Sequence, residues 1–274
     1  MDVLVLGARG SLGRLVCDEI VARGHRTRTV SRPEARDAEA LVKAASGAAA
    51  IINCAGASMQ LGLGHGWRGY RAVDTPIGLA AATAARRVGA RLVYVGVHHA
   101  PAMASCAYID AHERVVRAMS ELDGVVVRAT GFFSAFASFL PMARRGLLVD
   151  VGTGRTRTNP IDEHDLAAIV AESAFGDGPR EIAAGGPQVM SRAEVFETII
   201  AVANRRVRVI RLPVWLGDAS AAMLRVVHPR IGQLGKFAAQ LARHDVVAPA
   251  LGTRTLTEYF STLGEEPRAT LRAS

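Results

Sequence analysis

Residues 3–13 have the sequence Val-Leu-Val-Leu-Gly-Ala-Arg-Gly-Ser-Leu-Gly, and this stretch predicts the fold. Its apolar first part, residues 3–6, is typical of a buried strand. Apolar residues at helical spacing follow the glycines and predict a helix; they are Leu12, Leu15, Val16 and Ile20. A strand, a glycine turn and a helix in this order are typical of a dinucleotide-binding unit.

Each glycine of the turn has a separate expected role. Gly7 permits the tight turn, Gly10 lets the backbone approach a pyrophosphate, and Gly13 allows the helix to pack closely on the strand. Free N–H groups at the start of the helix would face the phosphate. The binding residues predicted in this stretch are Gly7, Arg9, Gly10, Ser11, Leu12 and Gly13. The alternative is a turn without a ligand, because glycine-rich turns also arise for purely steric reasons.

The end of the second expected strand, residues 27–30, indicates which cofactor binds. NAD-selective sites usually place an Asp or Glu at this point, where it accepts a hydrogen bond from the ribose 2′-hydroxyl. Here Ser31 and Arg32 follow the strand, and the first acidic residue is Glu34. A guanidinium binds phosphate in a bidentate manner. Arg32, together with Ser31 and Arg9, therefore predicts NADP(H), and the alternative is a set of exposed arginines without a ligand.

Strand and helix patterns continue to alternate along the chain. Further strands are expected over 48–53, 91–97 and 125–128, and helices over 33–46 and 74–88. This alternation predicts an α/β protein with a Rossmann-type, doubly wound parallel sheet. We expect residues 1–150 to form the NAD(P)-binding domain. Residues 151–274 are expected to form a smaller C-terminal lobe that covers the substrate pocket and packs on the first part as one structural unit.

Composition narrows the class of protein. Half of the 274 residues are hydrophobic and 21% are charged, as in globular proteins. The first strand begins at the second residue, which predicts a cytoplasmic protein without a signal peptide. Glycines and polar residues interrupt the longest uncharged stretch, 44–67, so we expect no membrane-spanning helix and no membrane partner. The three cysteines are far apart and predict neither a disulfide framework nor a metal site.

A formal charge of +8 raises the question of a nucleic-acid partner. Nearly all the positive residues are arginines, however, and they are spread through every segment of the chain. The densest cluster, 205–211, alternates as a half-exposed strand does, and no nucleic-acid-binding motif accompanies it. We therefore expect a solvated face there rather than a patch that binds a phosphate backbone, and no nucleic-acid partner.

Further candidate residues stand where expected strands end, because parallel sheets hold their chemistry at the carboxyl edge. Small residues in the turn Asn53-Cys54-Ala55-Gly56 would let a cofactor lie close to the backbone. The glycine-rich segment 57–68 predicts a loop over that edge. The remaining cofactor-binding candidates, at the ends of the two following strands, are Val97, Thr130 and Phe132.

Five segments together resemble the atypical short-chain dehydrogenase/reductase superfamily, which has a Rossmann fold. The chain is most similar to its NAD(P)H-binding NmrA-like members and to those related to the 39-kDa subunit of respiratory complex I. The segments are 7–13, 53–56, the helix that begins near Tyr108, 128–133 and 159–167. The resemblance covers nearly the entire chain and implies a nicotinamide cofactor.

The resemblance also implies catalytic residues. Reductases of this superfamily use a Ser, a Tyr that donates a proton to the carbonyl oxygen, and a Lys four residues later that binds the nicotinamide ribose and lowers the tyrosine pKa. Tyr108 matches the tyrosine, whereas His112 stands in place of the lysine and Gly96 or Val97 in place of the serine. Because histidine has an ordinary pKa of about 6.5 and lysine one of about 10.4, we expect His112 to stabilise a tyrosinate less well.

Two functions remain open from the sequence. The first is an NADP(H)-dependent oxidoreductase that acts on a small or medium, largely apolar carbonyl or enone, with hydride from the nicotinamide and a proton from Tyr108. The second is a non-catalytic NADP(H)-binding redox sensor, or a regulatory or assembly protein of NmrA type, which would have a protein partner. A fold by itself does not decide between them.

Overall fold

The computed structural model describes residues 1–57 and 67–265. Its centre is a six-stranded sheet in the order β2-β1-β3-β4-β5-β8, in which every neighbouring pair is parallel. The strands are β1 (Asp2–Leu6), β2 (Arg26–Thr29), β3 (Ala50–Asn53), β4 (Arg91–Val97), β5 (Gly124–Ala129) and β8 (Glu181–Ala184). The predicted parallel sheet is therefore confirmed.

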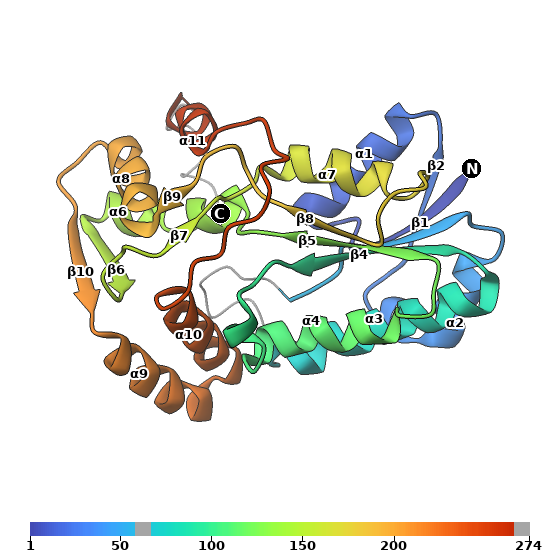
Figure 1. Ribbon diagram of the computed structural model, residues 1–274, viewed down its shortest axis with the longest axis horizontal. Helices are drawn as coiled ribbons and strands as arrows, with labels where there is room; N and C mark the ends of the chain where they lie inside the picture. Colours follow the sequence, from blue (N-terminus) through green and yellow to red (C-terminus); the bar gives the residue numbers. More distant parts are fainter. Residues whose placement is uncertain (58–66, 266–274) are drawn as a thin grey trace, which may run out of the picture.

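Helices cover both faces of this sheet (Figure 1). One face carries α1 (Ser11–Ala22) and α7 (Glu163–Glu172); the other carries α2 (Ala38–Ala45), α3 (Tyr70–Val88) and α4 (Ala107–Ala118). The side chains of β1 explain why its sequence is a continuous apolar run. Leu4 and Leu6 are buried among the helices of the second face, and Val3 and Val5 among those of the first.

The position of the ligand site follows from the strand order. After β2 the chain crosses β1, and β3 forms on the other side of β1. The order of the strands thus reverses between β1 and β3. In open α/β sheets ligands bind at such a reversal, outside the carboxyl ends of the strands. The turns that follow β1 and β3 are the two glycine-containing turns predicted to bind the cofactor.

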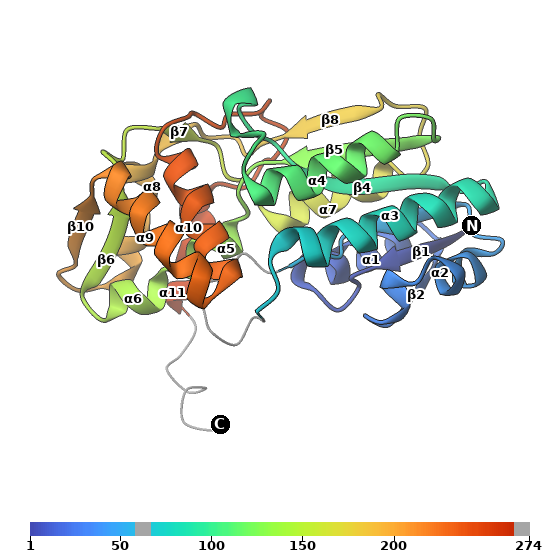
Figure 2. The same cartoon turned by 90° about the horizontal axis from the view of Figure 1, so that it is seen from below.

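A second group of elements lies beyond the carboxyl end of the sheet (Figures 1 and 2). It has two small sheets, in which β6 (Leu147–Val151) pairs with β10 (Arg208–Leu212) and β7 (Arg157–Thr158) with β9 (Met190–Ser191). Its helices are α5 (Phe133–Ala137), α6 (Leu140–Arg144), α8 (Arg192–Ala203), α9 (Val214–Val227), α10 (Pro229–Leu241) and α11 (Leu256–Glu265). The segment after residue 150 contributes to both groups, because α7 and β8 belong to the layers of the central sheet.

Several element boundaries differ from the expected ones for local reasons. The helix expected over 33–46 is divided into a 3-10 turn, η1 (Glu34–Arg36), and α2, because Asp37 caps α2 by accepting hydrogen bonds from two backbone N–H groups. Pro141 lies in the first turn of α6, where a missing N–H costs nothing. Most of the loop expected over 57–68 lies outside the described residues. Across the residues that are described, no helix is both long and apolar enough to traverse a bilayer.

Candidate functional site

The turn after β1 has the backbone geometry that the sequence predicts. Gly7 has a φ of +80°, a conformation that favours glycine. A Cβ atom at this position would lie 2.7 Å from the backbone nitrogen of Ala55, so the turn after β1 and the turn after β3 are in direct contact. Only a residue without a side chain fits between them, which brings the two candidate segments into one site.

Close packing of helix and strand depends on Gly13. A Cβ atom on Gly13 would lie 2.1 Å from the carbonyl oxygen of Gly7, which is far inside van der Waals contact. The same oxygen accepts a hydrogen bond from the N–H of Gly10 at 2.8 Å and closes the turn. The predicted roles of Gly7 in the turn and of Gly13 in packing therefore correspond to the geometry.

The start of α1 leaves backbone donors for a ligand. Gly10 is the N-cap residue and provides no side-chain hydrogen bond, so the first N–H groups of the helix, from Ser11, Leu12 and Gly13, lack a side-chain cap. These groups and the helix dipole favour an anion. The Leu12 side chain is buried, so this residue can contribute only its backbone. The arrangement fits the diphosphate of a dinucleotide.

The turn after β3 offers another donor. Asn53 is 1% exposed, and its Oδ1 accepts a hydrogen bond from the N–H of Ala55 at 2.9 Å. Its Nδ2 group is buried and bonds to none of the described residues, so it is available for a ligand oxygen. Burial raises the pKa of the Cys54 thiol to about 12, which makes this thiol unreactive. A contact of Cys54 and Gly56 with a cofactor, through their backbone, stays a prediction.

The arginines predicted to recognise the 2′-phosphate are exposed to solvent. Arg9 and Arg32 are exposed, and neither forms an ion pair with a described residue. Ser31 is engaged, because its N–H donates to Oε2 of Glu34 at 2.7 Å and its hydroxyl lowers the pKa of that carboxyl. Arg36, in η1, was not among the predicted residues. Its positive charge opposes the rise in the pKa of Asp74 that burial causes.

Tyr108 and its neighbours form an aromatic cluster at the start of α4. Its ring lies 4.8 Å from that of Tyr70, 4.9 Å from His112 and 4.9 Å from Phe237 of α10. Val97 belongs to the same apolar cluster, as do Met103, Cys106, Ile109 and Val246. Removal from water, with a smaller effect of the Asp74 charge, raises the pKa of the Tyr108 hydroxyl. Tyr108 therefore retains its proton at neutral pH.

His112 is an uncharged residue in this site. Burial lowers its pKa to about 4, and the positive charge of Arg128 acts in the same direction, against the opposing effect of Glu113. Its Nδ1 atom lies 2.7 Å from the hydroxyl oxygen of Tyr94 on β4. His112 thus occupies the place of the lysine without providing a positive charge.

Two buried polar residues of α3 were not predicted. Tyr70 is fully buried, and Asp74, one turn later, is 3% exposed. The Tyr70 hydroxyl and Oδ2 of Asp74 have no hydrogen-bond partner among the described residues, while Oδ1 of Asp74 accepts from the N–H of Ala57 at 2.6 Å. Burial raises the pKa of Asp74 to about 7. The spacing of Tyr70 and Asp74 on one helix face was the available signal, but the expected helix began only at residue 74.

Two other predicted cofactor contacts have internal partners. Thr130 is buried, and its hydroxyl donates to the carbonyl oxygen of Asn159 at 2.7 Å. Phe132 forms an isolated bridge with Ile161 and packs against the core between the sheet, α1 and α7. Their contact with a cofactor stays a prediction. The described residues contain no group of three or more His, Cys, Asp or Glu that could hold a metal ion.

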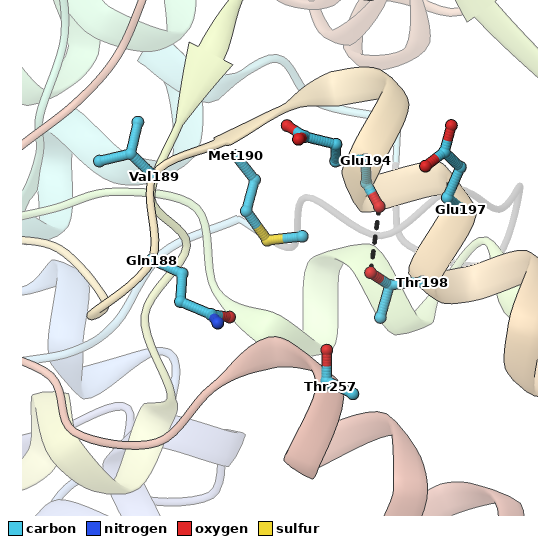
Figure 3. A pocket seen from close by; sticks show the side chains of 7 residues that line it. All are labelled: Gln188, Val189, Met190, Glu194, Glu197, Thr198 and Thr257. Atoms are coloured by element: carbon cyan, nitrogen blue, oxygen red, sulfur yellow. Dashed lines mark hydrogen bonds between the residues drawn. The ribbon is translucent and has the colours of Figure 1, made fainter.

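The second group of elements contains a hollow, and Figure 3 shows the side chains that line it. It lies between β9, α8 and the start of α11, and it is lined by Gln188, Val189, Met190, Glu194, Glu197, Thr198 and Thr257. None of these is a predicted site residue. The Glu194 carboxylate already accepts hydrogen bonds from the N–H and the hydroxyl of Ser191, as part of the cap of α8.

Curated proteins and solved structures that are similar to this chain include reductases and an epimerase family protein. No family model matches the chain. The chloroplastic divinyl chlorophyllide a 8-vinyl-reductase of Oryza sativa subsp. indica is 26% identical, over 97% of this chain and 79% of the relative. The solved structure of a human epimerase family protein with NADPH is 20% identical, with a TM-score of 0.72, and the match covers 97% of this chain and 100% of that one.

A second solved structure is that of an NADPH-dependent quinone oxidoreductase from Escherichia coli, in complex with NADPH. It is 16% identical, with a TM-score of 0.71, and the match covers 95% of this chain and 99% of that one. The Rossmann-type fold and the resemblance stated from the motifs are therefore confirmed. The cytoplasmic location stays a prediction, because the rice relative is named as chloroplastic.

Proposed function

We propose that this chain, an atypical short-chain dehydrogenase/reductase by its motifs and its fold, is an NADP(H)-dependent oxidoreductase that reduces a small or medium, largely apolar carbonyl or enone. One observation carries this proposal above all others. Tyr108, whose hydroxyl is protonated, lies in an apolar and aromatic cluster with Phe237 and with Val97, the last residue of β4. The cluster therefore lies at the edge of the sheet where the cofactor turns are found.

Several features support NADP(H) as the cofactor. The uncapped start of α1, the contact between the two turns and the buried Nδ2 of Asn53 fit a dinucleotide. The exposed guanidinium of Arg32 follows β2, where a 2′-phosphate is recognised in such folds. The human and Escherichia coli structures contain NADPH. When bound, NADPH supplies a hydride.

The side chains of this chain supply the remaining parts of the reaction. Tyr108 holds a proton at its hydroxyl and would donate it to a developing oxyanion or enolate. The apolar side chains around Tyr108, from α10 and from the segment between β4 and α4, exclude water and favour an apolar substrate. Because the pKa of Tyr108 is raised, its hydroxyl stays protonated and is a weaker acid than an ordinary tyrosine, so its proton passes only to a strongly basic oxyanion or enolate.

A second candidate function is an NADP(H)-binding sensor or regulatory protein. One observation favours it: desolvation lowers the pKa of the half-buried His112 to about 4, so the site has no cation in the place of the lysine that activates the tyrosine in related reductases. The observations that support cofactor binding apply equally to this function. It differs in predicting that NADPH binds without turnover and that a protein partner is recovered in only one redox state of the cofactor.

Binding and turnover measured on the same preparations test these functions. NADPH and NADH are titrated by calorimetry, and NADPH oxidation is followed with a panel of apolar aldehydes, ketones, quinones and enones. Tyr108→Phe is expected to reduce turnover about 100-fold or more while NADPH still binds, as for the loss of a general acid. Tyr259→Phe on α11 is the control and keeps full activity. Equal turnover of Tyr108→Phe and the native protein would show that another group donates the proton.

A further inference from the structure

We propose that Tyr94 is a positioning residue: its hydroxyl holds His112 in the tautomer with the proton on Nε2, so that His112 presents a neutral N–H donor to the nicotinamide ribose. The tautomer follows from contacts within the chain alone. Only the identification of the ribose as the acceptor rests on the proposed function.

The contact between these two residues joins the sheet to the helix that carries Tyr108. Tyr94, on β4, is 2% exposed and is packed in the core between the sheet, α3 and α4. Its hydroxyl oxygen lies 2.7 Å from Nδ1 of His112, and the two rings are tilted by 41°. Tyr108 also contacts the imidazole, and the two rings meet edge to face at 81° with their centroids 4.9 Å apart. Aromatic rings from β4 and from the preceding turn of α4 therefore both contact His112.

The direction of this hydrogen bond follows from the proton of the buried hydroxyl. Within the part of the chain that the structure describes, Nδ1 of His112 is the only hydrogen-bond partner of the Tyr94 hydroxyl. If Nδ1 carried the proton and donated it, the Tyr94 O–H would be buried without an acceptor. A buried hydroxyl that lacks an acceptor destabilises the folded protein. The stable arrangement has Tyr94 donating and Nδ1 accepting.

A neutral histidine whose Nδ1 accepts a hydrogen bond carries its proton on Nε2. No described residue accepts a hydrogen bond from this Nε2–H, so the group is available to a ligand. His112 lies one helical turn after Tyr108, at the position of the ribose-binding lysine. A ribose hydroxyl oxygen accepts a hydrogen bond from an imidazole N–H as it does from the ammonium group of a lysine. The group that orients a histidine through its other nitrogen determines which donor it presents.

The tautomer is measured directly in the full-length protein without cofactor. Histidine is labelled with ¹⁵N, and long-range proton–nitrogen correlations at neutral pH identify the protonated ring nitrogen of His112. We expect a single tautomer, with a proton on Nε2 and a hydrogen-bonded lone pair on Nδ1. In Tyr94→Phe we expect the Nδ1 signal to move to that of a nitrogen without a bonded donor. Tyr70→Phe is the matched control, because it removes a buried hydroxyl of the same cluster that has no partner.

Cofactor binding gives the second measurement. Tyr94→Phe is expected to weaken NADPH binding about fivefold, as for one neutral hydrogen bond of about 1 kcal/mol. In a His112→Ala background the same substitution is expected to have no further effect, because Tyr94 acts through His112. Additive losses in this double-mutant cycle would contradict the proposal.

The two measurements separate failure of this proposal from failure of the proposed function. A proton on Nδ1 of His112 in the native protein overturns the positioning role of Tyr94, whether or not NADPH binds. This spectrum needs no variant, so it decides the question even if Tyr94→Phe does not fold. Absence of NADPH binding in the native protein overturns the proposed function and the ribose contact, while the spectra still decide the tautomer.

Discussion

Arg32 is the residue whose charge should distinguish the two nicotinamide cofactors. Its guanidinium is exposed after β2 and has no ion-pair partner among the described residues, so the 2′-phosphate would gain a charge-assisted hydrogen bond there. Arg32→Ala is expected to weaken NADPH binding about 10- to 100-fold, the equivalent of a charged hydrogen bond of about 1.5–3 kcal/mol, and to leave NADH binding unchanged.

Calorimetric titration of both nucleotides checks this expectation. Arg155→Ala, in the turn between β6 and β7, is the control because it removes the same charge from an exposed position in the second group of elements. Equal weakening of NADPH and NADH in Arg32→Ala would assign the arginine to another part of the cofactor.

Asp74 is expected to make the stability of the protein depend on pH. Burial raises its pKa from 3.8 to about 7, so the folded protein binds this proton more tightly than the unfolded chain does. This tighter proton binding stabilises the folded state fully below pH 3.8, and the stabilisation is lost as the pH rises to about 7. Asp74→Asn keeps an oxygen that can accept from the Ala57 N–H but carries no charge. The free energy of unfolding of the variant should therefore exceed that of the native protein at pH 8, by up to about 4 kcal/mol for a shift of about three pKa units.

Urea denaturation at pH 5 and pH 8 measures this difference. The native protein should lose more stability than Asp74→Asn between these two values, since only the native protein has the ionising carboxyl. Parallel losses in the two proteins would show that the Asp74 carboxyl is as readily ionised in the folded state as in the unfolded chain.

At the scale of elements, α1 packs closely on β1 and the glycine turn because Gly13 has no side chain. A Cβ atom on Gly13 would lie 2.1 Å from the Gly7 carbonyl oxygen, so Gly13→Ala must displace the start of α1 from the turn. The N–H groups that face the diphosphate would move with it. We expect NADPH binding to weaken at least about 10-fold, because displacement of the helix affects several hydrogen bonds of about 1 kcal/mol each.

Gly178→Ala is the matched control for this substitution, because no atom lies within 4 Å of the added Cβ. Isothermal titration with NADPH and thermal unfolding are measured for both variants. A Gly13→Ala protein that binds NADPH as the native protein does would show that this turn is not the diphosphate site.

The β1 unit could be predicted because its requirements are local. Gly7 needs a positive φ and Gly13 needs space for a backbone, and neither requirement depends on distant parts of the chain. The parallel sheet was equally predictable from the strand and helix patterns. At this scale the sequence patterns missed mainly the start of α3. The helix begins at Tyr70, which follows a glycine and precedes a charged residue, whereas it was expected to begin at residue 74.

The contacts of His112 could not be predicted, because they depend on which elements pack together. Tyr94 and His112 lie on a strand and a helix, and only the packing of α4 on β4 brings the hydroxyl to Nδ1. The same holds for Phe237, which reaches Tyr108 from α10. Periodicity identifies the buried face of each element, but it does not identify the residue that a side chain meets on the neighbouring one.

At the scale of the whole molecule, the central sheet and the second group of elements are tied by polar contacts. The N–H of Tyr70 donates to the side-chain oxygen of Gln233 on α10 at 2.9 Å, which fixes α10 on the start of α3. Asn159 makes a more central connection. Its backbone oxygen accepts from Thr130 at the end of β5, and its side chain bonds to the backbone of Gly186 and Ala248.

Asn159→Ala should therefore destabilise the entire chain. Asn159 is fully buried, and its loss leaves the Gly186 carbonyl and both backbone groups of Ala248 without their partner, at about 1–3 kcal/mol for each unsatisfied group. With partial relaxation we expect a total loss of about 3–5 kcal/mol in the free energy of unfolding.

Urea denaturation followed by circular dichroism and by tryptophan fluorescence measures this loss. Because Asn159 joins the end of β5, the segment after β8 and the segment before α11, both signals should shift to lower urea concentration together. Gln188→Ala is the control, because this exposed side chain should change stability by less than about 0.5 kcal/mol. A similarly small change in Asn159→Ala would show that Asn159 does not tie the two groups of elements together. A shift of the fluorescence alone would show that the central sheet stays folded when the second group unfolds.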